Sequence, residues 1–113
     1  MELRQLEYFQ MASKLQNITR AAERLNVSQP NITVAIKKLE AELGIQLFDR
    51  SQKQLVLTPE GRVFLNRIEL ALRNIQDAIL EVNDYKSLQR GTIKIGIPSM
   101  IGAYLFPKIS TRL

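Results

Sequence analysis

The feature that most constrains this chain is an interruption between two helix-forming segments, in the stretch AAERLNVSQPNIT from Ala21 to Thr33. Asn26 adopts left-handed backbone geometry at lower cost than most residues, so it can end a helix as glycine commonly does. Ser28 is a favoured N-cap, and Pro30 follows in the first turn, where its missing N–H costs nothing. The stretch therefore predicts a tight turn between two crossed helices.

The segments around this turn have helical periodicity. We expect one helix over about Leu3–Leu15 and a second over about Ile18–Leu25, with Asn17 as the N-cap of the second. A third helix continues from the Ser28 cap to about Leu43. The two adjacent alanines of the second helix suit the crossing, because larger side chains would hold the helices apart.

Two short apolar pieces follow, Leu47–Phe48 and Leu55–Leu57, and a polar loop separates them. This arrangement is typical of a β-hairpin. Thr58 and Pro59 then predict the N-cap and the first residue of a fourth helix, which continues to about Leu88.

The fourth helix carries apolar residues at a period near 3.5, and a pattern held this long indicates a partner helix, most simply from a second copy of the chain. The alternative is that the helix lies on its own domain. We favour the partner, because a domain this small offers little surface to cover the apolar stripe. The predicted dimerisation residues are Phe64, Leu65, Ile68, Leu72, Ile75, Ile79 and Val82.

Past Gly91 the period changes to two, and Thr92–Ile97 alternates as a strand that Pro98 ends. One strand cannot stand alone, so we expect it to begin a second domain of α/β type that this chain does not complete. The expected division is a small domain of three helices and a hairpin at 1–58, a linker and dimerisation helix at 59–90, and the incomplete domain at 91–113.

Composition removes several classes of function. The 113 residues include no cysteine and no histidine, which excludes disulfides and thiolate zinc sites and removes the usual general base. We therefore expect neither a metal nor a cofactor, and no enzyme. No apolar run approaches the roughly 18–20 residues of a membrane span, and the N-terminus has no apolar signal core, so we expect a cytoplasmic protein.

The net charge of +5 permits a polyanionic partner without proving one. Residues 1–60 hold 8 lysines and arginines against 7 acidic residues, and residues 61–113 hold 8 against 4. Any interaction of the first half with a polyanion must therefore depend on where its charges lie.

The run AAERLNVSQPNITVAIKKLEAELGIQLFDR, followed by LTPEG, resembles the N-terminal region of LysR-type transcriptional regulators over about residues 1–90. The later GTIKIGIP resembles the first strand of that family's effector-binding domain. The resemblance implies a mainly α fold: a winged helix-turn-helix of three helices plus a β-hairpin wing, a long dimerisation linker helix, and the first strand of a truncated α/β domain. It also implies a bacterial regulator of promoter DNA that is a homodimer, with a tetramer and a small-molecule effector for the full-length protein.

In a helix-turn-helix the first turns of the second motif helix enter the major groove. Gln29 and Asn31 carry amides that can pair with adenine, and Thr33 offers a methyl and a hydroxyl group. For Gln29 the alternative is a part in the cap alone. Val34 and Ala35 are apolar where family members often carry long polar side chains, so we expect thymine-methyl contacts or DNA shape to carry more of the specificity.

Other residues suit the DNA backbone and the minor groove. Thr19 and Arg20 can help hold a phosphate, and Lys37 suits phosphate contact, with a solvated charge as its alternative. The predicted DNA-binding residues are Thr19, Arg20, Ser28, Gln29, Pro30, Asn31, Thr33, Val34, Lys37, Arg50 and Lys53.

The resemblance implies that the wing reaches the minor groove, where Lys53 is the first choice for a contact. Arg50 contacts DNA or pairs with a local carboxylate such as Asp49, and the sequence leaves this open. Ser99 follows the predicted strand, where family members often contact the effector; its alternative is a helix N-cap.

Two other functions remain as alternatives. The fourth helix could pair with a different protein, with the helix-turn-helix serving only as packing. An enzyme acting on nucleic acid would need a nucleophile and base or a carboxylate cluster, and the acidic residues here are scattered.

Overall fold

The structure is a computed structural model that describes residues 1–89. Residue contacts divide the chain into one unit of residues 1–75 and a second unit from residue 76 onward. The predicted strand at Thr92–Ile97, the incomplete domain at 91–113 and Ser99 lie outside the described residues.

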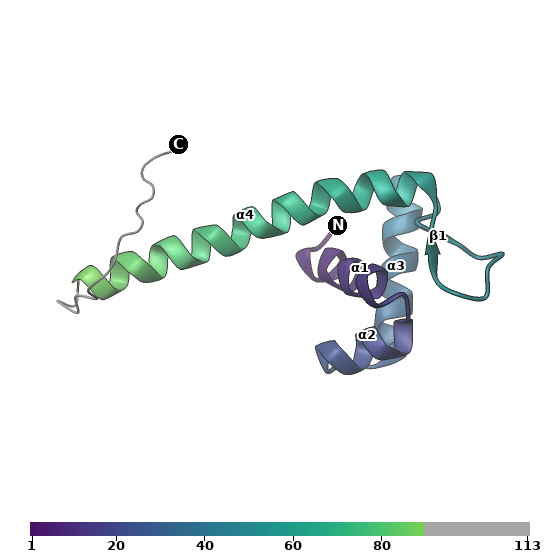
Figure 1. Cartoon of the computed structure of the whole chain (residues 1–113), viewed down its shortest axis with the longest axis horizontal. Helices are drawn as coiled ribbons and strands as arrows, with labels where there is room; N and C mark the ends of the chain where they lie inside the picture. Colours follow the sequence, from purple (N-terminus) through teal and green to yellow (C-terminus); the bar gives the residue numbers. More distant parts are fainter. Residues whose placement is uncertain (90–113) are drawn as a thin grey trace. The chain divides into compact units, whose positions relative to one another are not determined.

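The described part is mainly helical, with one antiparallel pair of short strands (Figure 1). This confirms the predicted class of fold. The elements are α1 (Leu3–Leu15), α2 (Ile18–Leu25), α3 (Gln29–Leu43), β1 (Phe48–Asp49), β2 (Val56–Leu57) and α4 (Pro59–Gln89).

The caps around α2 and α3 are the ones that the sequence predicts. The side chain of Asn17 accepts a hydrogen bond from the N–H of Arg20 at 2.8 Å, and Asn26 has a left-handed backbone with φ 59°. The Ser28 hydroxyl oxygen accepts from the N–H of Asn31 at 3.3 Å. The turn between α2 and α3 is therefore fixed by local hydrogen bonds.

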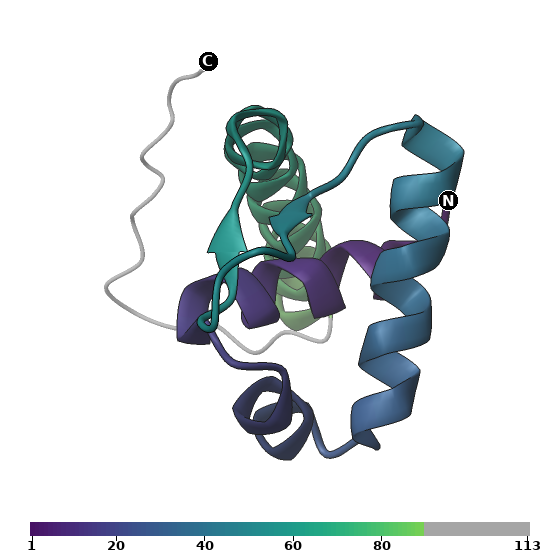
Figure 2. The ribbon, with the colours of Figure 1, turned by 90° about the vertical axis from the view of Figure 1, so that its right-hand side faces the viewer.

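The three helices α1, α2 and α3 contact one another, and Figure 2 shows α3 running steeply across the direction of α1. Ala21 and Ala22 are buried in α2 between its neighbours, as the crossing requires. The rings of Phe9 and Phe48 meet edge to face with 5.5 Å between centroids. The largest fully buried side chains are Phe9, Phe48, Ile32, Ile36, Leu39 and Leu47.

The two strands pair with Phe48 opposite Leu57 and Asp49 opposite Val56. The loop between them projects away from the helices (Figure 1), as the predicted wing does. Each strand has only two residues, so the hairpin depends on other contacts for its position.

The start of α4 is joined to the hairpin by Thr58. Its N–H donates to the carbonyl oxygen of Leu47 at 3.0 Å, and its hydroxyl oxygen accepts from the N–H of Gly61 at 2.9 Å. A Cβ atom on Gly61 would lie 2.2 Å from the same Leu47 carbonyl oxygen. Glycine is therefore required here, because the helix passes this close to the backbone.

The predicted dimerisation stripe of α4 divides into a buried part and an exposed part. Leu65, Ile68 and Leu72 are buried within the chain's own core, and Phe64 is half-buried with its ring centroid 5.8 Å from that of Phe9. The apolar surface of Leu65, Ile68 and Leu72 is covered within the chain, whereas Phe64 stays partly exposed. This burial favours the alternative, a helix that lies on its own domain, for this part of α4.

Beyond Leu72 the same stripe is exposed. Ile75, Ile79, Val82, Tyr85 and Leu88 are all exposed. We refer to residues 59–75 as the proximal part of α4 and to residues 76–89 as its distal part. Among the described helices, none combines the length and the apolar character that a membrane span needs.

Candidate nucleic-acid interface

The first turn of α3 presents polar side chains to solvent. Gln29, Pro30 and Asn31 are exposed, and Thr33 is half-buried, while Ile32 between them is fully buried. This alternation follows from the helical period, because the apolar face of α3 packs on the core and leaves the other face open. The residues predicted to enter the groove are therefore accessible.

A hydrogen bond joins the start of α2 to the first turn of α3. The Thr19 hydroxyl donates to Oε1 of Gln29 at 3.2 Å. The amide keeps its two N–H donors and one oxygen lone pair, which are the groups that a bidentate contact with adenine uses. Ser28, and not Gln29, provides the side-chain cap of α3.

Val34 and Ala35 differ in position although both are apolar. Ala35 is buried and belongs to the core face of α3, so of this pair only Val34 is open to a thymine-methyl contact. Val34 is 50 % exposed. Arg20 and Lys37 are exposed too, on α2 and α3 respectively.

Glu40, near the end of α3, holds the wing. Its Oε2 accepts hydrogen bonds from the backbone N–H groups of Leu47 at 2.8 Å and Phe48 at 3.4 Å. Its Oε1 lies 2.6 Å from the guanidinium nitrogen of Arg50. One carboxylate therefore connects α3 to β1 and to the residues on either side of β1 through three donors.

This geometry concerns one of the two alternatives for Arg50, the pairing with a local carboxylate. The residue pairs with a carboxylate, as one alternative held, but the partner is Glu40 and not Asp49. Asp49 instead accepts hydrogen bonds from the hydroxyl and the N–H of Ser51, and these bonds lower the pKa of Asp49. The ion pair helps to position the wing, Arg50 stays partly exposed, and its contact with DNA stays a prediction. Lys53 is exposed in the same loop.

The sequence reasoning missed Glu40, although a signal was present. An acidic side chain in the last turns of a helix is unfavourable beside the negative end of the helix dipole. No basic residue lies in the last turn of α3. A carboxylate at such a place indicates donors from outside the helix, and here they come from the chain that follows.

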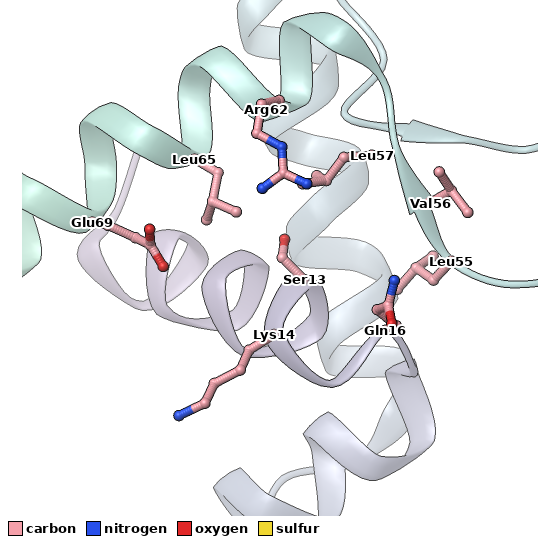
Figure 3. A pocket seen from close by; sticks show the side chains of 9 residues that line it. All are labelled: Ser13, Lys14, Gln16, Leu55, Val56, Leu57, Arg62, Leu65 and Glu69. Carbon is pink, nitrogen blue, oxygen red and sulfur yellow. The ribbon is translucent and has the colours of Figure 1, made fainter.

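A pocket of about 280 Å³ lies between the end of α1, β2 and the start of α4 (Figure 3). Figure 3 shows Arg62 pointing toward Ser13 and Lys14 pointing away from the pocket. The Ser13 hydroxyl donates to the carbonyl oxygen of Phe9 at 2.8 Å, so its hydrogen is already used in a bond within α1. In the part of the chain that the structure describes, no group of three His, Cys, Asp or Glu residues could hold a metal ion.

Three packed helices, a tight turn before α3 and a two-stranded hairpin define a winged helix-turn-helix domain. Residues 3–62 match the family described as bacterial regulatory helix-turn-helix protein, lysR family. The chain belongs to this family, which confirms the resemblance that its motifs carry.

Relatives and solved structures agree with this assignment. The chain is 40 % identical over 111 residues to the transcriptional regulator BsdA of Bacillus subtilis, covering 97 % of this chain and 38 % of that protein. It is 39 % identical to the regulator YcgK of the same species, over 96 % of this chain and 34 % of that protein. The chain thus spans about a third of the length of these curated relatives.

Among solved structures, the DNA-binding domain of BenM in complex with catB site 1 DNA superposes with a TM-score of 0.74 and 37 % identity. The match covers 77 % of this chain and 97 % of that one. DarR of Vibrio fischeri in complex with DNA gives a TM-score of 0.71 and 34 % identity, over 78 % of this chain and 30 % of that one.

Proposed function

We propose that this chain is the DNA-binding portion of a bacterial transcriptional regulator. The first turns of α3 read the major groove of double-stranded DNA, and the wing reaches the minor groove through Lys53. The observation that carries the proposal is the exposed row of polar side chains that opens α3, held in place by the Ser28 cap and the Thr19–Gln29 hydrogen bond. The relatives solved with DNA support it.

Two copies pair through the exposed distal part of α4, so that two DNA-binding domains face DNA with two-fold symmetry. The role is one of binding without catalysis, in the cytoplasm. In a longer chain, a following effector-binding domain would sense a small molecule and support a tetramer, as the family resemblance implies.

The experiment that tests the proposal is selection of bound duplexes from a random pool with the 113-residue chain. We expect enriched sequences with two related half-sites in opposite orientation, whose centres lie one helical turn of about 10–10.5 base pairs apart or a multiple of it. If no sequence is enriched and random duplex is not retarded at low salt and micromolar protein, the proposal is wrong and a protein-interaction role takes its place.

The wing has its own test. Loss of one protein cation that contacts a phosphate or the minor groove should reduce the slope of log affinity against log salt by about 1 for each chain. We expect Lys53→Ala to weaken binding of the selected duplex and to flatten this slope. Arg73→Ala removes the same charge from an exposed position on α4 and should leave the slope unchanged. An unchanged slope for Lys53→Ala would remove the wing from the mechanism.

A further inference from the structure

Val34 is an apolar side chain on a polar surface. Of the described residues of α2 and α3, it is the only large hydrophobic side chain that is exposed. It lies one helical turn beyond Pro30, which is exposed on the same side of α3, and one turn before Lys37. Single exposed hydrophobic residues are common on protein surfaces, so exposure alone explains nothing.

Two further points set Val34 apart. A β-branched residue in a helix loses side-chain freedom, and Val34 does not recover this cost by burial in its own chain. It also stands among groups that hydrogen-bond or carry charge, namely Gln29, Asn31 and Lys37, on the turns of α3 that the proposed function directs to the major groove.

We infer that Val34, with the ring of Pro30 beside it, is a specificity-determining contact for the C5-methyl group of a thymine in each half-site. This inference rests on the proposed function and deepens it. In the major groove the thymine methyl is the one apolar group that a base pair of unmodified DNA presents, and apolar side chains contact it. The side chain of Val34 has no hydrogen-bonding group with which to read any other base edge.

Replacement of thymine by deoxyuridine tests this contact, because it removes the methyl group and keeps the hydrogen-bonding groups of the pair. Each thymine of the highest-affinity selected duplex is replaced in turn, and the dissociation constant is measured by fluorescence anisotropy. For the unchanged chain we expect one position in each half-site to weaken binding by about fourfold, the ratio for burial of one methyl-sized group.

The protein side of the test uses Val34→Ala. We expect this variant to bind the thymine duplex more weakly and to distinguish thymine from deoxyuridine at that position by less than about twofold. Its helix should remain intact, since alanine has the higher helix propensity, and thermal unfolding followed by circular dichroism checks this. Val63→Ala removes an exposed valine from α4 and should keep the full effect of the methyl group.

The outcomes separate the two proposals. A methyl effect that is absent at every thymine, or that persists in Val34→Ala, overturns the inference while DNA binding stands. Failure of the chain to bind any selected duplex overturns the proposed function, and the inference with it. A methyl effect lost in Val34→Ala and kept in Val63→Ala supports the assignment.

Discussion

The proximal and distal parts of α4 have the same apolar period but different surroundings. In the proximal part Ile68 is 6 % exposed and packs in the core, whereas in the distal part Ile79 is 57 % exposed. The period alone therefore tells where a helix is apolar and does not tell what covers it. Within one chain, the apolar stripe of α4 is buried only as far as the other helices and the hairpin extend along it.

The largest effect is expected in the proximal part. Ile68→Ala removes buried side-chain atoms and leaves a cavity, so we expect the free energy of unfolding to fall by about 2–5 kcal/mol. Urea unfolding followed by circular dichroism, at a fixed protein concentration, measures it. Leu70→Ala is the control, because Leu70 is exposed on the same helix and should change stability by about 0.5 kcal/mol at most. Equal losses in the two variants would contradict the burial of Ile68 in the core.

The next effect concerns pairing of the distal part. Ile79→Asp places a charge in the proposed contact between copies, so we expect self-association to weaken by about tenfold or more. Sedimentation velocity over a range of protein concentrations measures this. Leu80→Asp is a matched control, since Leu80 is equally exposed but points to another face of α4. The proposed pairing surface is wrong if both variants weaken self-association equally, or if the unchanged chain stays a monomer at high concentration.

The smallest effect is expected at Ile75, the last residue of the proximal part. This side chain is 40 % exposed, between the values of Ile68 and Ile79. We expect Ile75→Ala to lower the free energy of unfolding by about 1 kcal/mol or less, clearly below the loss for Ile68→Ala. The same unfolding measurement locates the end of the core, and a loss as large as that of Ile68→Ala would extend the core past Leu72.

The features that the sequence predicts well are those decided by neighbouring residues. Asn17 and Ser28 cap helices, and Asn26 ends one, because each acts on backbone groups within a few positions of itself. The exposure of Gln29 and Asn31 follows from the same local period once the core face of α3 is known. These residues made both the helix-turn-helix and most of its candidate interface predictable.

What the sequence could not decide depends on distant segments. Leu65 and Ile79 look alike in the apolar pattern, and only the position of α1 and the hairpin shows which of them is covered. Glu40 reaches donors seven to ten positions along the chain, past a turn whose path the local pattern does not fix. Gln16 ends α1 with a left-handed backbone, φ 52°, and its residue type gives no signal of this.

The bonds of Glu40 have a consequence for any operator that this domain recognises. Because one carboxylate ties the wing to the end of α3, the wing has little freedom to shift along a duplex on its own. In the proposed function α3 reads bases and the wing reaches the minor groove, so an extra base pair inserted between these two segments of the duplex would cost one of the two proposed contacts. Under the proposed function, duplexes bound by this domain are expected to vary in sequence more readily than in length within a half-site.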